Sequence, residues 1–404
     1  GTTFPGGNVH AVIYTVANAT TTTNASITDN CFENISSAGL TGFSASAIGI
    51  LQSTSTGVLD GLSIERNTIN NVAVNTGDWP TGKIAYGIQI NVGGGGGYLS
   101  TDGEVLNAVI SNNEISNLSG FISTGIGLEG NTKDAVVENN LVSDLFGRKF
   151  SGNRAGGAYD LSGLKFENNR YVSTVTVQDN SFRVTTFTHD ATPGLGYAVS
   201  NYVPAGTAFT GGGGGTTGEA TISCNWLGSN INGDLVDNTS FTGKIFNKAG
   251  AVTNFVPFLV NDTDDDAGMV GFQPAPLSCI GGPVQVFNGN TFIAVYTEIQ
   301  AAIDDATTLS GHTVRIAAGT YVENVDAVTG GKDLIFAPGA SPGCVTISGD
   351  FTLNAGDALE IEIEGTTACT EHDQFIVTGT VDLGGASLIT PLGMYLAEAG
   401  DEIV

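Results

Sequence analysis

The stretch that decides the fold is LEGNTKDAVVENNLVSDLFG, residues 128–147, where a short apolar run meets Asn140 and then resumes. Its centre, VENNLVSDL from Val137, has an apolar residue, an asparagine three positions later, and apolar residues two and five positions beyond that asparagine. A single match is compatible with chemistry at Asn140, with a turn, or with one copy of a repeated unit. The rest of the chain distinguishes among these.

The same pattern recurs through the first part of the chain, at intervals that are mostly 27 to 46 residues. Intervals of this size are typical of stacked supersecondary units. The asparagines at the shared position are Asn30, Asn67, Asn113, Asn140, Asn169, Asn180 and Asn225. Asn169 and Asn180 are only 11 residues apart, too close for a full unit, so one of them is a chance match or a second corner of the same unit.

Two of the longest intervals contain runs of five glycines, residues 93–97 and 211–215. A strand interior made of glycine alone would lose much conformational entropy on folding, so these runs predict loops that leave a regular unit. Subtracting them brings the long intervals towards the short ones. The repeat is therefore more regular than its spacing suggests.

A short apolar strand, a polar corner and another apolar strand form the unit of a β-solenoid. Asparagine tolerates the left-handed backbone of a tight corner, and its side chain can bond backbone groups of the next unit. Parallel pairing of such units buries Ile, Val, Leu and Phe inside. We predict an all-β solenoid, in which Asn140 is a structural corner and not a catalytic group.

The composition favours a folded, soluble, β-rich protein. The chain has 404 residues, with 58 glycines, 11 prolines, and 13 basic against 40 acidic residues, for a net charge of −27. Such acidity disfavours nucleic acid and anionic membranes as partners. Disorder is the first alternative, but 41% hydrophobic residues, many of them β-branched, can build a core. No apolar run is long enough to predict a membrane span.

The five cysteines fit neither a CxxC metal site nor a small disulfide scaffold. Few lysines and many Thr, Asn and Gly residues favour an extracellular or cell-surface location, where disulfides can form. We predict the pairs Cys224–Cys279 and Cys344–Cys369 and leave Cys31 unpaired. Five buried thiols remain the alternative.

A helix-like pattern appears once, in TEIQAAIDDATTLSGHTVRIAAGTYVENV from Thr297. It predicts a short helix near 297–309, with Thr297 as N-cap and Gln300 three positions later. The expected apolar stripe consists of Ile299, Ala302, Ile303 and Ala306.

Three stretches carry a resemblance to one family of folds. IQAAIDDA followed by TVRIAAGTYVENV is similar to the N-terminal cap and first turn of pectin-lyase-like right-handed parallel β-helices, where the helix plugs the open end. ISCNWLGS, with FVPFLVNDTDDDAGMVGFQPA after it, resembles the closing segment of β-helical modules in large secreted or surface-exposed bacterial proteins of the adhesin or autotransporter type. Leu227 stands where the second Trp of their NWWG-type turn is usual. CTEHDQFIVTGTVDLGGASL, from Cys369, resembles further segments of this kind.

The order of these resemblances predicts two modules. Residues 1–280 would be the C-terminal part and closing segment of one β-helix, and 284–404 the capping helix and opening turns of a second. Both ends of the chain then read as cuts through a longer pattern.

Enzymes of the resembled family carry carboxylates on one outer sheet, with Ca²⁺ and a basic residue or with a pair of acids. The most cationic stretch here, GRKFSGNR, contains Arg148, Lys149 and Arg154, for which a solvated loop is favoured over contact with an anionic sugar. Asp304 and Asp305 are adjacent acids on the expected helix, where a solvated helix face is the simpler interpretation. We predict no catalytic residue.

The densest group of oxygen ligands is NDTDDDAG, from Asn261. A short, flexible, acidic segment suits a hard cation, although this one lacks the spacing of an EF-hand. The possible Ca²⁺ ligands are Asp262, Asp264, Asp265 and Asp266, with a metal-free acidic loop as the alternative. The scattered histidines, none of which lies in a metal-ligand pair, are His10, His189, His312 and His372. No credible nucleotide or nucleophile motif occurs.

The pattern of the fold recurs throughout the sequence, whereas motifs for catalysis are few. This combination favours a structural protein, such as an adhesin, a sheath, or a surface-layer or filament subunit. Open solenoid ends leave backbone groups unpaired, so we expect self-association or tandem modules that stack head to tail. The alternatives are a polysaccharide lyase or hydrolase of the pectin-lyase-like class and a non-catalytic carbohydrate-binding module. Catalysis is the less favoured of these interpretations.

Overall fold

The computed structural model describes residues 2–3, 8–15, 20–37, 44–52, 56–74, 83–93, 103–147, 161–189, 192–193, 196–203, 219–228, 244–247, 251–275, 278–289, 291–339 and 343–390. Strands dominate these residues, with one α-helix and two short 3₁₀-helices, η1 (Val172–Thr174) and η2 (Val184–Thr186). The chain divides into two compact units. Unit 1 comprises Gly1–Asn230 and Asp234–Cys279, and unit 2 comprises Ile231–Gly233 and Ile280–Val404.

Four sheets build most of unit 1, and they are named here A to D. Sheet A contains β1 (Thr2–Thr3), β2 (Val9–Thr15), β6 (Ala45–Gln52), β10 (Ile84–Val92), β14 (Ile122–Leu128), β19 (Ser162–Phe166), β24 (Tyr197–Asn201) and β26 (Ile245–Asn247). Sheet B contains β3 (Thr21–Thr23), β7 (Val58–Asp60), β11 (Glu104–Leu106) and β15 (Thr132–Lys133). Sheet C contains β4 (Ser26–Thr28), β8 (Ser63–Glu65), β12 (Val109–Ser111), β16 (Val136–Glu138), β20 (Thr176–Gln178), β25 (Glu219–Ser223) and β27 (Val252–Asn254).

Sheet D completes the set. It contains β5 (Cys31–Ser36), β9 (Thr68–Ala73), β13 (Glu114–Ser119), β17 (Leu141–Val142), β18 (Leu145–Gly147), β21 (Ser181–Phe182), β22 (Thr188–His189) and β23 (Thr192–Pro193). A separate two-stranded sheet joins β28 (Phe258–Leu259) to β29 (Cys279–Gly281). Pairing in sheets A to D is parallel except for β1 with β2 and β22 with β23.

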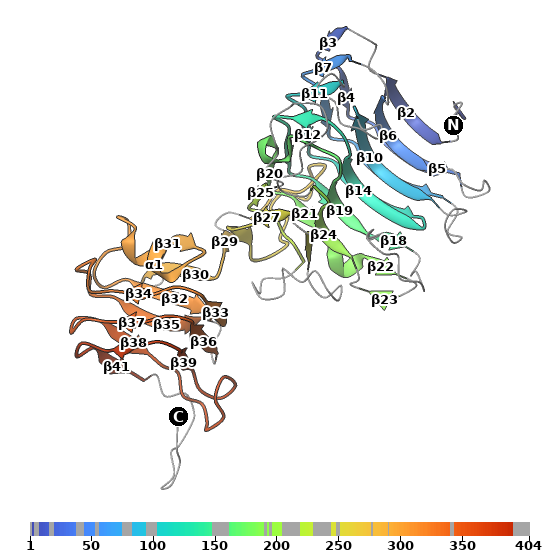
Figure 1. Cartoon of the computed structure of the whole chain (residues 1–404). Helices are drawn as coiled ribbons and strands as arrows, with labels where there is room; N and C mark the ends of the chain where they lie inside the picture. The colour runs from blue at the N-terminus through green and yellow to red at the C-terminus, as the bar shows by residue number, and fades with distance from the viewer. Residues whose placement is uncertain are drawn as a thin grey trace. The chain divides into compact units, whose positions relative to one another are not determined.

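In the first four circuits the chain visits the sheets in the order A, B, C, D, and strands pair with their counterparts from the previous circuit. After β15 the described chain adds no strand to sheet B and passes from sheet A directly to sheet C. We call one circuit a rung. Figure 1 shows β2, β6, β10, β14, β19 and β24 lying side by side in this way. Stacked parallel sheets of this kind confirm the all-β prediction and are consistent with a β-helix or solenoid.

Register between rungs keeps apolar side chains in columns. Ile27 pairs with Ile64, which pairs with Ile110 and then, through the next rung, with Val137. Successive residues of a strand face opposite sides of the sheet, so a one-residue slip would expose a whole column. The interior columns form one continuous core in unit 1.

Unit 2 has a separate core and three sheets, named here E, F and G. Sheet E contains β31 (Thr291–Tyr296), β30 (Val284–Asn288), β32 (Thr313–Ala317), β35 (Ile335–Gly339), β38 (Ala358–Glu360) and β41 (Ser387–Ile389). Sheet F contains β33 (Gly319–Tyr321), β36 (Cys344–Ile347) and β39 (Gln374–Val377), and sheet G contains β34 (Val325–Asp326), β37 (Phe351–Thr352) and β40 (Val381–Asp382). Pairing is parallel from β32 onwards, whereas β30 runs antiparallel to both neighbours.

The helix of unit 2, α1 (Ile299–Asp304), is shorter than predicted and is capped differently. Thr297 is not its N-cap. The backbone N–H groups of Ile299 and Gln300 instead donate to the carboxylate of Glu323, at 2.9 and 2.8 Å. Asp305 ends the helix because its side chain accepts hydrogen bonds from the N–H and hydroxyl of Thr307, at 2.7 and 2.6 Å, a local arrangement that competes with helical pairing.

The apolar stripe of α1 is correspondingly shorter than predicted. Ile299, Ala302 and Ile303 are fully buried in the core of unit 2, but Ala306 lies beyond the helix and is exposed. The stripe therefore ends with the helix.

Candidate functional site

Six of the seven predicted corner asparagines form a continuous hydrogen-bonded column, here called the asparagine ladder. In each step the side-chain oxygen of one asparagine accepts both the backbone N–H and the side-chain amide of the asparagine on the preceding rung. Asn140 accepts from Asn113 at 3.0 and 2.9 Å and donates to Asn180 at 3.0 and 2.9 Å. The ladder consists of Asn30, Asn67, Asn113, Asn140, Asn180 and Asn225.

The ladder amides also donate to backbone carbonyls, as Asn140 does to Ile110 and Glu138 at 2.8 and 2.9 Å. Every ladder member except Asn30 is at most 1% exposed. A buried amide without partners would be costly, and here the stacking of rungs supplies partners for each one. The ladder is a structural device, and its groups are already engaged.

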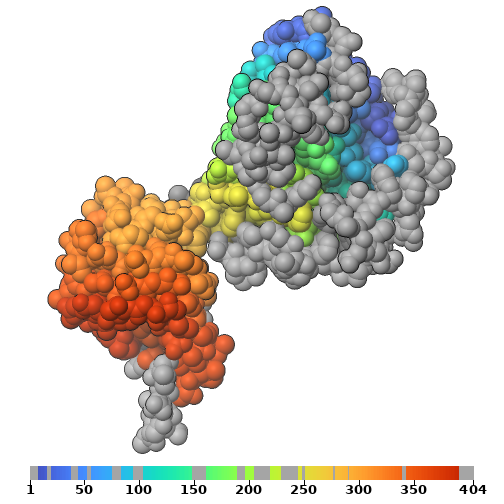
Figure 2. Space-filling view, viewed as in Figure 1, coloured from blue at the N-terminus to red at the C-terminus, as the bar shows by residue number. Residues whose placement is uncertain are grey.

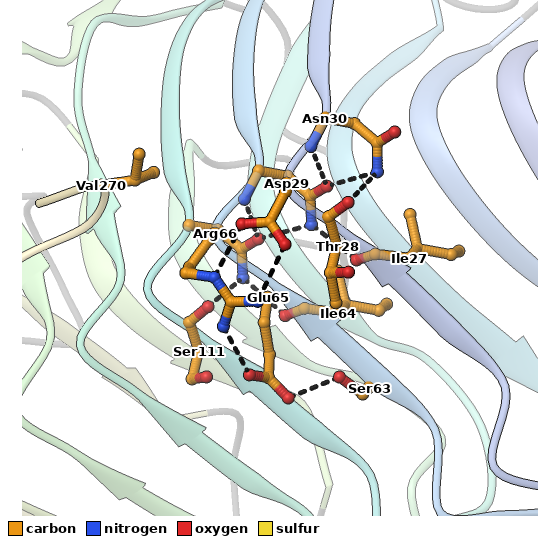
Figure 3. Close-up of polar contacts among 12 residues, drawn as sticks. Ile27, Thr28, Asp29, Asn30, Ser63, Ile64, Glu65, Arg66, Ser111 and Val270 are labelled. Carbon is orange, nitrogen blue, oxygen red and sulfur yellow. Dashed lines mark hydrogen bonds and ion pairs between the residues drawn. The ribbon is translucent and has the colours of Figure 1, made fainter.

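One part of the corner prediction is wrong. The left-handed residue is not the ladder asparagine but the residue before it. These preceding residues have φ between 52 and 59°, and they are Asp29, Arg66, Asn112, Asn139, Asp179 and Cys224. Because the αL residue turns the chain, the next side chain points inward and can join the ladder. Arg66 adopts this conformation despite its bulk and pairs with Asp29 and Glu65 at 2.7 and 3.1 Å (Figure 3).

Asn169 lies at a second corner of the same rung as Asn180. It follows β19 of sheet A, whereas Asn180 follows β20 of sheet C. Its side-chain oxygen accepts from the N–H of Tyr171 at 2.9 Å and of Thr132 at 3.4 Å. The short interval between the two asparagines is thus the length of chain between two corners.

The two predicted disulfides, Cys224–Cys279 and Cys344–Cys369, are present, and Cys31 is free and exposed. Cys224 immediately precedes the last ladder residue, Asn225. The first disulfide therefore ties the end of the ladder to the end of unit 1.

Residues 255–275 form a closing segment that packs on the corner beside the ladder. The N–H of Phe272 donates to the carbonyl of Asn139 at 2.8 Å, and the Asn139 side chain donates back to the carbonyl of Phe272 at 3.1 Å. Phe272 is fully buried, in a small cluster with Leu141 and Leu259. Gly271, at φ 100°, is needed because a Cβ there would lie 2.4 Å from the carbonyl oxygen of Asn139.

Three acidic side chains of this segment, Asp262, Asp264 and Asp266, accept hydrogen bonds from the protein. Asp262 accepts from the hydroxyl of Ser181 at 2.7 Å and from the guanidinium of Arg183 at 2.9 Å. Asp264 and Asp266 accept backbone N–H groups within the segment, and Asp265 does not converge with them on a ligand site. Among the described residues, no group of three or more His, Cys, Asp or Glu side chains is placed to hold a metal. This geometry does not support the calcium prediction.

The other residues considered for chemistry do not gather. Arg148, Lys149 and Arg154 lie outside the described residues, as does the side chain of His189. Asp304 is exposed at the end of α1, and Asp305 is used by Thr307. His312 accepts from the N–H of Leu309 at 3.1 Å, and His372 lies in a turn of unit 2. In the described part of the chain, no helix is long and apolar enough to cross a membrane.

Charged groups converge instead on the outer face of sheet A, which sequence reasoning missed. The ammonium of Lys165 lies 2.6 Å from Glu129 and 2.7 Å from Glu167. Tyr86 and Gln89 donate to Glu129 at 2.7 and 3.0 Å. We call these five residues the Lys165 cluster. Gly127 on β14 pairs in register with Gln89 on β10 and with Lys165 on β19. The stacking of rungs therefore brings together residues that are far apart in the sequence.

The electrostatics of this cluster are set by burial and by mutual charge. Burial raises the pKa of the Glu129 carboxyl, but the Lys165 ammonium and hydrogen bonds from Lys165, Gln89 and Tyr86 outweigh burial and bring that pKa below its usual value. Burial lowers the pKa of Lys165, yet the charge of Glu129 more than reverses this and holds that pKa well above normal. The pKa of Tyr86 is raised by burial and by Glu129. The ion pair therefore stays charged at neutral pH.

The chain matches no protein-family model, and no curated protein or solved structure is significantly similar to it. Buried ion pairs are weak contributors to stability because desolvation offsets their attraction, and perturbed groups of this kind concentrate at functional sites. The Lys165 cluster is thus one candidate site.

The second candidate site is the last described rung of unit 2. It contains β39, β40 and β41, which are red in Figure 2. Several of its apolar side chains are exposed, among them Val381 and Leu388. Val381 is 51% exposed although its register partner Phe351 is 1% exposed. Leu388, which pairs with Leu359, is 65% exposed. We call this segment, residues 374–389, the end rung.

Proposed function

We propose that the chain is an extracellular structural protein, built from right-handed parallel β-helices of the pectin-lyase-like kind, that associates end to end through its open rungs. It would serve as a surface, sheath, filament or adhesin subunit. The exposed apolar column of the end rung carries this proposal. Unit 1 would then be the closing part of one β-helix and unit 2 the beginning of another.

The end rung exposes apolar side chains of the kind that the earlier rungs bury. Val381 and Leu388 continue columns that are buried or half-buried one rung earlier, and β39, β40 and β41 are edge strands of their sheets. An edge strand offers unpaired N–H and C=O groups, and an apolar column beside it favours burial. The partner that suits both features is another β-rung.

The first described rung of unit 1 has related properties. Ile27 and Phe32 are only partly buried, whereas their register partners Ile64 and Ile69 are completely buried. The opposite boundaries are closed, since α1 packs at the beginning of unit 2 and the closing segment packs at the end of unit 1. Among the described residues, each unit thus has a more exposed rung at one end and a covered rung at the other, and this difference between the two ends is the polarity that head-to-tail stacking requires.

Light scattering and electron microscopy over a range of protein concentration test this proposal. We expect reversible, concentration-dependent assembly that weakens in the variant Leu388→Glu, because a charge would be buried in the contact. The matched control is Val322→Glu, since Val322 is 84% exposed and lies outside the end rung. Wild-type protein that stays monomeric at high concentration, or equal loss of assembly in both variants, would contradict the proposal.

The two disulfides support the extracellular part of the proposal, because such bonds persist in oxidising compartments. Calcium at the acidic closing segment stays a prediction. A chelator should lower the melting temperature if Asp262 to Asp266 hold a cation. An unchanged melting temperature would contradict the calcium prediction.

A polysaccharide lyase or hydrolase is the second candidate, favoured by the Lys165 cluster, which places a lysine between two carboxylates. Lyase action on a uronate polymer produces an unsaturated, absorbing product, so turnover is simple to measure. Loss of such activity in Lys165→Met would favour this candidate over a purely structural role.

A further inference from the structure

We propose that the first described rung of unit 1 binds a β-rung that carries an asparagine at the matching corner, so that the asparagine ladder continues into the partner. The binding surface consists of β3, β4 and β5, the edge strands of sheets B, C and D. This binding rests on the proposed end-to-end association, and it specifies the partner for one end of unit 1.

The asparagine ladder ends at Asn30 with an unused acceptor. In every step, the side-chain oxygen of the later asparagine accepts two hydrogen bonds from the earlier one. Asn30 donates in this way to Asn67 at 3.1 and 3.0 Å, and its amide also donates to the carbonyl of Thr28 at 2.8 Å (Figure 3). Its own side-chain oxygen accepts no hydrogen bond from any residue that the structure describes. A further asparagine on a preceding rung would fill this acceptor with the same two donors.

The backbone of the first rung offers donors on the same side. In the next rung, the N–H groups of Ser63 and Thr68 donate to first-rung carbonyls at 2.8 and 2.9 Å. Their register partners in the first rung are Ser26 on β4 and Cys31 on β5. Among the described strands, β4 and β5 each have a neighbour on one side only. In a parallel sheet, the N–H groups of Ser26 and Cys31 then point to the open side, where a preceding rung would present carbonyls.

Apolar side chains add to this surface. Ile27 and Phe32 are half-buried, although their columns are completely buried in the next rung. A rung that covers them would remove apolar area from water as well as pair the edge strands. Sheet A differs at this end, because β1 already pairs antiparallel with β2 there. The partner is therefore expected on sheets B, C and D.

The unused acceptor selects among possible partners. Two copies that met through their first rungs would set one Asn30 oxygen against the other, without a donor between them. An aspartate at the partner corner would likewise oppose two acceptors, whereas an asparagine offers an amide beside its backbone N–H. The end rung, residues 374–389, contains no asparagine. The partner for this end is therefore a rung of the kind that builds unit 1.

A synthetic rung peptide tests the inference. Residues 104–119, EVLNAVISNNEISNLS, copy β11, β12 and β13 with Asn113 at the corner, and the matched control peptide carries Asn113→Ala. Fluorescence anisotropy of each labelled peptide, titrated with the full chain, measures its affinity. We expect the asparagine peptide to bind and the alanine peptide to bind about tenfold more weakly, because two hydrogen bonds are lost. Equal affinities, or no binding of either peptide, would overturn the inference.

Variants of the chain locate the bound peptide. Asn30 is exposed, so its variants are expected to fold. Asn30→Ala should bind both peptides equally, whereas Asn30→Asp, which keeps a side-chain acceptor, should still prefer the asparagine peptide. A preference that survives Asn30→Ala would show that the peptide binds elsewhere and would contradict the inference.

The same variants distinguish this binding from self-assembly. Leu388→Glu should weaken self-assembly, measured by light scattering, and leave peptide binding unchanged. Asn30→Ala should leave self-assembly through the end rung unchanged. If Asn30→Ala weakens self-assembly as strongly as Leu388→Glu does, the end rung of another copy occupies this surface and the inference is wrong. Chains that stay monomeric but discriminate between the peptides would contradict self-association alone.

Discussion

Asn139 and Phe272 exchange two hydrogen bonds although they are 133 residues apart in sequence, with donor–acceptor distances of 2.8 Å from Phe272 N–H and 3.1 Å from the Asn139 amide. The contact fastens the closing segment to the corner of an earlier rung. It joins the left-handed residue of a corner to a fully buried aromatic residue. Closure of unit 1 therefore depends on this contact as well as on the Cys224–Cys279 disulfide.

Phe272→Ala should destabilise unit 1 by about 3–5 kcal/mol, the usual cost of removing a buried phenylalanine. Thermal or denaturant unfolding measures this change. Met269→Ala is the control, because Met269 belongs to the same segment but is 50% exposed. A similar small effect for both variants would mean that the closing segment adds little to stability.

Asn140→Ala should cost about 3 kcal/mol or more, because it leaves the buried N–H and amide of Asn113 without their acceptor and removes several donated bonds. Asn30→Ala should cost less than about 1 kcal/mol, since Asn30 is the exposed first member of the ladder. Equal losses of unfolding free energy in the two variants would contradict the view that burial makes the ladder important.

Loss of the Cys224–Cys279 disulfide, in the double variant with both residues changed to serine, should lower the free energy of unfolding by about 2–4 kcal/mol. Limited proteolysis should then cut the closing segment earlier than the rungs. Cys31→Ser provides the control, because Cys31 is free and exposed and should leave stability unchanged. Unchanged stability of the double variant would show that Phe272 alone secures the segment.

Stability should depend on pH through Glu129 and Lys165. The folded pKa of Glu129 is depressed, so its contribution is present above its unfolded pKa and is lost as pH falls through the folded pKa. The folded pKa of Lys165 is raised, so its contribution is present below its unfolded pKa and is lost as pH rises through the folded value. We expect the ion pair to contribute fully between these limits.

Melting temperature measured against pH checks this expectation. The double variant Glu129→Gln, Lys165→Met should lose part of the wild-type dependence at both ends of the range. Identical pH profiles for the variant and the wild type would show that other groups control acid and alkaline unfolding. Glu114→Gln serves as the control for removal of one carboxylate, because Glu114 is half-buried on β13 of sheet D and lies outside the Lys165 cluster.

Much of the fold could be predicted because its signals are local. Strands appear as short apolar runs and corners as Asn or Asp at regular intervals, so the stacked parallel sheets follow from spacing. The helix was located correctly, but its N-cap was not, because its first N–H groups are capped by Glu323, more than twenty residues away. Its early end follows from the local hydrogen bonds between Asp305 and Thr307. Asn169 and Asn180 both fit the spacing of apolar residues around an asparagine. Only the structure shows that they lie at two different corners of one rung.

The candidate sites were far less predictable. Glu129 and Lys165 stand in different rungs, and nothing in the spacing of single acidic or basic residues marks them. Asp262 read as a cation ligand because acidic residues cluster in sequence, but Ser181 and Arg183, about eighty residues earlier, take up its carboxylate. Contacts between segments that are distant in sequence, and not the local density of acidic residues, decide the partners of this side chain.

By itself, the sequence determined the repeating strand and corner pattern, the helix position and the cysteines available for pairing, since each depends on the conformational preference of a few neighbouring residues. Tertiary structure decided which residue of each corner turns left-handed, what caps α1, how Asn139 meets Phe272, and that Lys165 lies between Glu129 and Glu167. The physical reason is register. Stacking rungs places side chains from distant segments a few ångströms apart, and only that placement converts a column of residues into a ladder, a core or an ion cluster.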